Sequence, residues 1–172
     1  MTQFTNRDLV ACSVRGVRHD FVVASAYCDT NGPVIPTGLA NLVQHCQDKH
    51  LPLLIGADSN AHSTLWGPDQ NERGTEMEDF LMAYNLLVLN DGLKPTWAQN
   101  GRTSFIDITV LNRYAVDKNY GENWEVSDEE SFSDHKILTF DIIAPTRSVP
   151  LKRNMKRINW PLFTAEVDRK LS

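Results

Sequence analysis

Cysteine is scarce in this sequence, and its spacing excludes two common uses of the residue. The 172-residue chain contains three cysteines, Cys12, Cys28 and Cys46, which are odd in number and lie far apart. No two of them form the C-x-x-C pair of a zinc or redox motif, and they give no disulfide framework. The sequence therefore predicts an intracellular protein of a reducing compartment, nuclear or cytoplasmic, and not a secreted one.

Long hydrophobic runs are missing as well. No apolar stretch approaches the roughly 20 residues that a membrane helix needs, and residues 1–7 contain no apolar segment typical of a signal peptide. Hydrophobic residues make up 41% of the chain and charged residues 23%, as in ordinary globular proteins. Internal repeats and low-complexity tracts are also absent. The sequence therefore predicts one globular domain with no membrane partner.

The net charge of −5 conceals two parts of opposite sign. Residues 147–172 hold seven basic and two acidic side chains, a net charge of +5, so the other 146 residues carry −10. An acidic body is compatible with clustered metal-binding carboxylates, and a basic tail with either a nucleic-acid contact or a solvated linker. Prolines interrupt the pattern after Pro145, so we interpret 1–145 as the domain and 146–172 as a basic linker, with a short helix near 163–171.

The periodicity of apolar residues predicts strands with two intervening helices. Helical spacing predicts one helix over about 37–48, and a capping-box pattern at Thr75 and Glu78 predicts the start of a second. Residues 58–73 have no period and predict a long loop, which in compact domains is usually functional. The resulting fold class is α/β with a mixed sheet. Apolar runs typical of strands cover 9–14, 21–27, 52–56, 86–89, 105–111, 124–126 and 137–143.

Polar side chains follow the apolar run at 52–56. Asp58, Asn60 and His62 come directly after it, and functional groups commonly lie on loops at strand ends. A carboxylate and an amide two residues apart can share one hard cation and one water molecule. The same residues are equally typical of an Asx-rich turn after a strand, so this patch alone leaves both interpretations open.

Three further patches have the same double interpretation. Asp134 and His135 precede the last predicted strand and offer a metal ligand and an imidazole, or a capped loop with an exposed histidine. Asp107 lies within an apolar run, where burying a charge is costly. Its carboxylate is therefore expected either to pair, with histidine a natural partner, or to face solvent. Tyr27 ends a predicted strand, where most tyrosines pack and keep a solvated hydroxyl.

The order and spacing of these patches are more specific than any one of them. A strand ending in Tyr27, G-x-D-x-N-x-H at 56–62, S-x-I-D-x-T-x-L at 104–111 and S-D-H at 133–135 together resemble the endonuclease/exonuclease/phosphatase superfamily, in its apurinic endonuclease-like branch. Further motifs resemble the endonuclease domain of jockey-like non-LTR retrotransposons. They are Asn60-Ala61-His62, Leu65-Trp66-Gly67, Arg73-Gly74 and, after a basic stretch, Asn159-Trp160-Pro161-Leu162-Phe163.

This resemblance implies a fold, an activity and a set of site residues. The fold is a four-layered αββα sandwich of the DNase I-like type, and the activity is Mg²⁺- or Mn²⁺-dependent nicking of DNA. In a longer polyprotein the partner domain would be a reverse transcriptase. The implied catalytic residues are Asp58, Asn60, Asp107 and His135; the phosphate-binding residues are Tyr27, His62 and Ser104; the metal ligands are Asp58, Asn60 and Asp134.

One departure from the family pattern leads to an alternative. Such sequences begin with two strands that carry an Asn and then a metal-binding Glu, whereas no glutamate precedes Glu72 here. The resemblance thus predicts an N-terminally truncated domain, and a catalytically impaired remnant that only binds is the alternative function. A phosphatase or phosphodiesterase for small molecules is a third interpretation, against which the N-A-H, L-W-G and N-W-P-L-F motifs argue.

Overall fold

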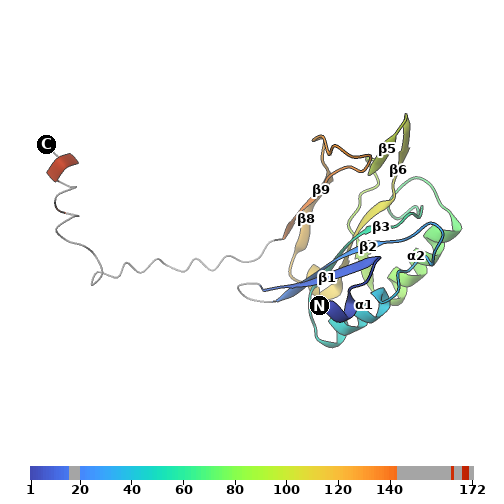
Figure 1. The fold of residues 1–172 in the computed structure, drawn as a ribbon, viewed down its shortest axis with the longest axis horizontal. Helices are drawn as coiled ribbons and strands as arrows, with labels where there is room; N and C mark the ends of the chain where they lie inside the picture. The colour runs from blue at the N-terminus through green and yellow to red at the C-terminus, as the bar shows by residue number, and fades with distance from the viewer. Residues whose placement is uncertain (16–19, 143–163, 165–167, 171–172) are drawn as a thin grey trace.

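A five-stranded mixed sheet forms the centre of the molecule (Figure 1). The computed structural model describes residues 1–15, 20–142, 164 and 168–170. The elements in chain order are η1 (Thr2–Phe4), β1 (Leu9–Val14), β2 (Phe21–Tyr27), α1 (Leu39–Asp48), β3 (Leu53–Asp58), α2 (Glu72–Ala83), β4 (Leu86–Val88), β5 (Trp97–Gln99), β6 (Arg102–Ser104), β7 (Asp107–Asn112), α3 (Arg113–Val116), β8 (Tyr120–Val126) and β9 (Leu138–Ile142).

The central sheet has the order β1-β2-β3-β7-β4. Strands β2 and β3 are parallel, with α1 in the connection between them, and the other pairs are antiparallel. The predicted mixed sheet is therefore confirmed, and the β1–β2 hairpin has the predicted bounds. The linker predicted over 146–172 lies outside the described residues except for 164 and 168–170, which are helical and fall within the short helix expected near 163–171.

Side chains alternate between the two faces of the central sheet, so the hydrophobic core is divided into two clusters. Ile55 and Val110 belong to the larger cluster, which also contains the buried side of α1. Leu54 and Leu111 instead pack with Tyr120 of β8 and with β9. The result is a layer of helices, a central sheet and the two-stranded β8–β9 sheet on its other face.

The second helix begins earlier than its sequence pattern predicts. The capping box at Thr75 and Glu78 is wrong, because Asn71 caps α2 by accepting a hydrogen bond from the Gly74 amide at 2.7 Å. The side chain of Thr75 donates to the Asn71 carbonyl, and Glu78 accepts a hydrogen bond from Ser63. Both side chains are therefore engaged inside the helix or with the preceding loop.

The strand expected at 105–111 begins two residues later, so Asp107 is its first residue rather than an interior one. Two side-chain hydroxyls also bind the backbone just before it. The Thr96 hydroxyl accepts hydrogen bonds from the amides of Ile106 and Asp107, and the Ser59 hydroxyl donates to the Ile106 carbonyl. Pairing with β3 therefore starts at Asp107, opposite Asp58.

Two further findings bear on the predictions from composition. The three cysteines are free, with Cys28 and Cys46 buried. Within the described part of the chain, no helix is long and apolar enough to cross a membrane.

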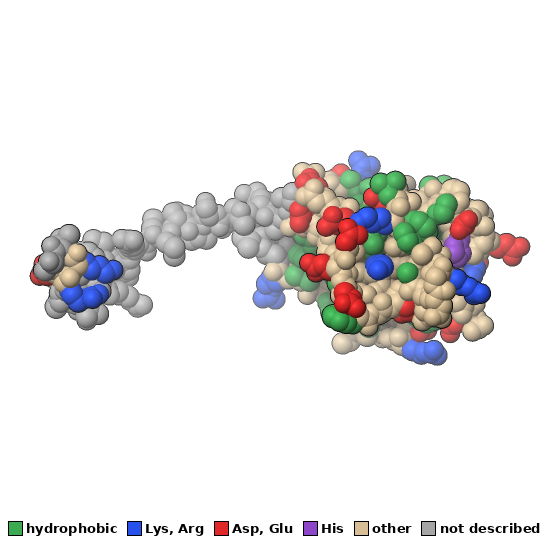
Figure 2. All heavy atoms as spheres, turned by 90° about the horizontal axis from the view of Figure 1, so that it is seen from above, with side chains coloured by type: hydrophobic (Ala, Val, Ile, Leu, Met, Phe, Trp, Pro, Cys, Tyr) green, Lys and Arg blue, Asp and Glu red, His purple; other side chains and the backbone are tan. Residues whose placement is uncertain are grey.

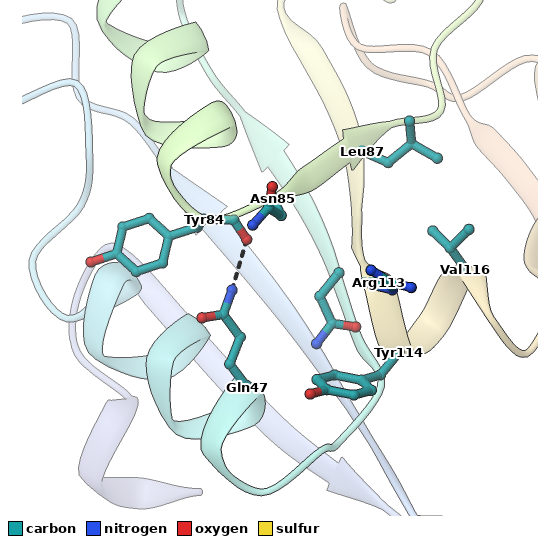
Figure 3. A pocket seen from close by; sticks show the side chains of 8 residues that line it. Gln47, Tyr84, Asn85, Leu87, Arg113, Tyr114 and Val116 are labelled. Carbon is teal, nitrogen blue, oxygen red and sulfur yellow. Dashed lines mark hydrogen bonds between the residues drawn. The ribbon is translucent and has the colours of Figure 1, made fainter.

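A cavity of about 540 Å³ lies beside β4 and α3, at the opposite end of β7 from Asp107. Figure 3 shows the side chains that line it. Among them is Gln47, whose amide donates to the Tyr84 carbonyl at 2.7 Å.

Candidate active site at the ends of three strands

The register of the central sheet places three polar residues in a row. Tyr27 ends β2 beside Asp58, which ends β3, and Asp58 pairs in turn with Asp107, the first residue of β7. Because β2 and β3 are parallel and β7 is antiparallel to them, two strand ends and one strand start meet at this edge. Residues far apart in sequence are thus neighbours by backbone pairing alone.

A cavity of about 480 Å³ opens at this edge. It brings together six of the predicted site residues, which come from β2, β3, the loop after β3, β6 and the segment before β9. Its lining also includes residues that no motif singled out, among them Thr30, Asn71 and Trp97. The predicted site residues in the lining are Tyr27, Asp58, Asn60, His62, Ser104 and His135.

Asp107 contacts this group through His135. The imidazole Nδ1 lies 3.0 Å from both carboxylate oxygens of Asp107, whose side chain is 16% exposed against 35% for His135. The histidine partner predicted for this carboxylate is therefore present. A carboxylate bound to Nδ1 fixes the ring orientation and directs the other nitrogen, Nε2, away from the pair.

The protonation of His135 reflects competing influences. Burial disfavours the charged ring, but the hydrogen bond and charge of Asp107, with smaller contributions from Asp58 and Asp134, outweigh it and raise the pKa of His135 above 6.5. The imidazolium form therefore persists to higher pH than in a free histidine. A cation held at the cavity wall can stabilise negative charge that develops on a bound phosphate.

The environment of Asp58 disfavours its charged form, whereas that of His135 favours the charged ring. Its Oδ1 atom is buried and has no hydrogen-bond partner. Burial, and then the charge of Asp107, raise the pKa of its carboxyl above the ordinary value of 3.8. An unsatisfied carboxylate oxygen beside the Asn60 amide is a donor set that suits Mg²⁺, which binds one or two carboxylates together with substrate phosphate and water.

Asn60 is held by the loop that follows β3. Its backbone is in the left-handed region, with φ of +45°, which asparagine tolerates better than most residues. Its side-chain amide donates to the Cys28 carbonyl at 3.2 Å. The preceding residue, Ser59, is fully buried and bonds the Ile106 carbonyl through both its amide and its hydroxyl. This arrangement leaves Asn60 at the cavity wall.

Asp134 is the predicted site residue that the structure places apart from the others. Its Oδ2 accepts hydrogen bonds from Trp97 Nε1 at 3.0 Å and Gln99 Nε2 at 3.2 Å, and it is not part of the cavity lining as described. Across the described residues, no three His, Cys, Asp or Glu side chains cluster in a way that would hold a metal ion. Asp134 as a metal ligand stays a prediction.

Comparison with known proteins places this geometry in a family. The sequence model of the endonuclease–reverse transcriptase family matches residues 21–139, which include every residue of the cavity. The chain belongs to this family. This agrees with the resemblance to retrotransposon endonuclease domains of the endonuclease/exonuclease/phosphatase superfamily that the motifs carry.

Two proteins similar to this chain come from retrotransposons. One is the putative 115 kDa protein in the type-1 retrotransposable element R1DM of Drosophila melanogaster, 29% identical over 175 residues. That match covers 92% of this chain but only 17% of the relative, so the chain spans about a sixth of that protein's length. The other is the endonuclease domain of TRAS1, a telomere-specific non-LTR retrotransposon, with a TM-score of 0.73 and 25% identity.

The likeness to the TRAS1 domain extends over 85% of this chain and 68% of that one. It confirms the predicted DNase I-like α/β fold. In this family member the described residues contribute a helix layer, the five-stranded sheet and the β8–β9 pair.

Several residues of the site had no clear signal in the sequence. Thr96 is fully buried, and its hydroxyl positions the amide of Asp107. Trp97 forms a backbone bridge with His135 in addition to its bond to Asp134. Thr96 precedes β5 and Trp97 begins it, in a stretch whose strands have only three residues each and show no period. The one available signal was for Arg73, which appeared among the family motifs without an assigned role.

Proposed function

We propose that the cavity at the ends of β2, β3 and β7 nicks DNA by metal-assisted hydrolysis of a phosphodiester bond. The observation that carries the proposal is the His135–Asp107 pair facing the unsatisfied carboxylate of Asp58 in one cavity. A carboxylate and an imidazolium on one cavity can serve the attacking water and the phosphate respectively.

His135 would stabilise the phosphorane-like transition state. Asp107 holds Nδ1, so Nε2 is the atom available to donate to a phosphate oxygen. The raised pKa favours the protonated ring, whose positive charge would lie where negative charge grows. Asp107 would act by orienting this ring and stabilising its charge.

Asp58 would orient or deprotonate the attacking water. Its raised pKa brings the carboxyl nearer to the range in which a base accepts a proton effectively. Asp58 and Asn60 would hold a divalent cation, Mg²⁺ or Mn²⁺, and Asp134 is the further predicted ligand. When bound, such an ion neutralises charge on the non-bridging phosphate oxygens.

The remaining polar lining would bind the substrate. Tyr27, His62 and Ser104 come from three different segments around the cavity and supply two hydroxyls and an imidazole for phosphate oxygens. Substrate DNA and attachment to a reverse transcriptase domain in a longer protein are both part of this proposal, supported by the family match and the two retrotransposon relatives.

Conversion of supercoiled plasmid to the nicked form, with Mg²⁺ or Mn²⁺ present, tests the proposal. We expect Asp58→Ala and His135→Ala each to lower the nicking rate by at least about 100-fold. Matched controls are Asp117→Ala, whose side chain is 60% exposed, and His50→Ala, whose ring packs on Tyr114 near the other cavity. Both controls should nick at the rate of the unaltered chain.

The same assay separates the alternative. A chain that binds plasmid DNA but does not nick it with either ion would be the impaired remnant rather than an enzyme. Robust nicking that survives Asp58→Ala and His135→Ala would instead show that the reaction occurs elsewhere on the molecule.

A further inference from the structure

The guanidinium of Arg73, in the first turn of α2, joins two loops of the cavity. Its Nε donates to the Asn60 carbonyl at 3.1 Å. Its Nη1 donates to the Gly32 carbonyl at 3.1 Å, and its Nη2 to the carbonyls of Asp29 at 3.0 Å and Cys28 at 3.4 Å. The side chain is half-buried and forms no ion pair within the described part of the chain.

These two loops both contribute to the cavity wall. One follows β2 and carries Thr30; the other follows β3 and carries Asn60 and His62. Each begins at a strand end that bears a site residue, Tyr27 or Asp58. All four acceptors of Arg73 are backbone carbonyls, so its contacts fix the path of the chain rather than neutralise an acid.

The same turn of α2 also packs closely against the loop after β3. A Cβ atom added at Gly74 would lie 1.7 Å from the His62 carbonyl oxygen, so only glycine permits this approach. The Asn71 side chain accepts from the His62 amide at 3.1 Å, and the Asn71 amide donates back to the His62 carbonyl at 3.0 Å. His62 is therefore held through both of its backbone groups.

We infer that Arg73 is a positioning residue for the nicking reaction, holding the 28–32 and 59–63 loops in the geometry that the cavity requires. Gly74 completes the contact by allowing α2 to approach His62. The inference rests on the proposed function of the cavity. Arg73 touches neither Asp58 nor His135, so its effect passes through the backbone of Asn60 and of the loop after β2.

Lysine cannot replace this arginine. The planar guanidinium spans four acceptors on two loops, whereas an ammonium group donates from one point at the end of a flexible stem. Arg73→Lys therefore keeps the charge and removes the bridge. Gly74→Ala keeps the guanidinium and displaces the loop by steric overlap with His62. The two variants therefore disturb the packing of α2 against the loop after β3 in two different ways.

The test compares these variants with two controls in the plasmid-nicking assay. Arg113→Lys is the matched control, because Arg113 is 82% exposed and pairs only loosely with Asp117 at 3.8 Å. Leu81→Ala is the stability control, since Leu81 is buried in α2 away from the cavity lining. We expect kcat to fall roughly 10- to 100-fold in Arg73→Lys and Gly74→Ala, with KM for DNA changed much less.

Nicking rates are compared under conditions in which urea denaturation curves show every variant to be folded. Leu81→Ala should then nick normally despite its lower stability, and so should Arg113→Lys. If Arg73→Lys loses no more activity than Leu81→Ala, Arg73 is structural only and the inference is overturned. A loss confined to KM would also overturn it, because the residue would then serve DNA binding.

Amide hydrogen exchange separates this inference from the proposed function. Arg73→Lys should raise exchange in segments 28–32 and 59–63 while leaving β1 and the start of β2 unchanged. If the unaltered chain does not nick, the proposed function fails, yet faster exchange in these two segments would still support the positioning role. Unchanged exchange in both segments would overturn the role whatever the activity.

Discussion

At the scale of single residues, Asp58 occupies a setting that opposes folding. Its Oδ1 is buried without a hydrogen-bond partner, and Asp107 places a second carboxylate directly opposite across the β3–β7 pair. Like charges opposite one another in a sheet are destabilising. The residue that the proposed reaction most requires is therefore one that the fold alone would not favour.

We predict that Asp58→Asn stabilises the protein while abolishing nicking. Because burial and Asp107 raise the pKa of Asp58, its carboxylate charge is less favourable in the folded chain than in the unfolded chain. Removing the charge should increase the free energy of unfolding at pH 7 by about 1 kcal/mol. Urea denaturation measures the first effect and the plasmid assay the second.

The exposed Asp117 gives the control for this change, since Asp117→Asn should leave stability within about 0.5 kcal/mol. Added Mg²⁺ should raise the melting temperature of the unaltered chain and have less effect on Asp58→Asn. A destabilised Asp58→Asn variant would contradict the argument, since it would mean that the carboxylate contributes favourable contacts.

A second residue-scale prediction concerns the pH dependence of His135. Its pKa is raised in the folded state, so its contribution to stability is full below the ordinary value of 6.5 and is lost as pH rises through the folded value. Asp107→Asn should lower the His135 pKa and flatten this decline. NMR titration of the imidazole and urea midpoints measured across pH check both effects. A His135 pKa unchanged by Asp107→Asn would show that the pair is not coupled.

At the scale of elements, the loop between β3 and α2 is built around one tryptophan. Trp66 is fully buried, and its Nε1 donates to the Ala61 carbonyl at 3.2 Å. The neighbouring Gly67 lies so close to Phe105 that a Cβ would come within 2.6 Å of it. This long loop is therefore packed like core, which explains how it can hold Asn60 and His62 in place.

We predict that Trp66→Phe lowers the free energy of unfolding by about 1–3 kcal/mol, because it removes the indole N–H that donates to the Ala61 carbonyl and opens a void. Urea denaturation measures the change. Leu65→Ala, at a side chain that is 53% exposed, should change stability much less. Equal losses in the two variants would mean that the loop does not depend on the buried indole.

Sequence periodicity predicted the long elements well and the short ones poorly. The β1–β2 hairpin, α1 and β3 follow from apolar patterns that match the buried faces. The start of α2 was missed because Asn71, a side chain outside the apolar pattern, caps it. Strands β5 and β6 have three residues each, too few for any period to be visible, and β8 extends four residues further toward the N-terminus than predicted.

The same limit applies to the site. Asp58 and Asp107 could be singled out from the sequence because each adjoins an apolar run, although Asp107 was expected inside its strand, and only the structure shows that the two pair. The orientation of Asp134 could not, because it is decided by Trp97 and Gln99 on a strand that the sequence does not reveal. Its contacts depend on tertiary structure rather than on local pattern.

At the scale of the whole molecule, charge is distributed unevenly along the sequence. Figure 2 shows one face on which acidic and basic side chains are interspersed among hydrophobic ones. The sequence after residue 146 carries +5, against −10 for the rest. Long-range attraction to DNA should therefore depend strongly on the C-terminal basic residues.

We predict that replacing Lys152, Arg153, Lys156 and Arg157 by glutamine in the full chain weakens DNA binding at low salt. The slope of log affinity against log salt should fall by up to about 4, because fewer counterions are released. Binding titrations at several salt concentrations measure it. An unchanged slope would support the interpretation of this segment as a solvated linker.

The pairing of Asp58 with Asp107 also has a consequence for how the protein folds. The two carboxylates stand side by side in the sheet although almost fifty residues separate them in sequence, and β2 joins β3 only through a crossover that contains α1. Non-local and parallel pairings form late, because the entropy of closing long loops must be overcome first. During refolding, then, the hairpin and helices should appear before cutting activity does, and a nascent or partly folded chain should be unable to damage DNA.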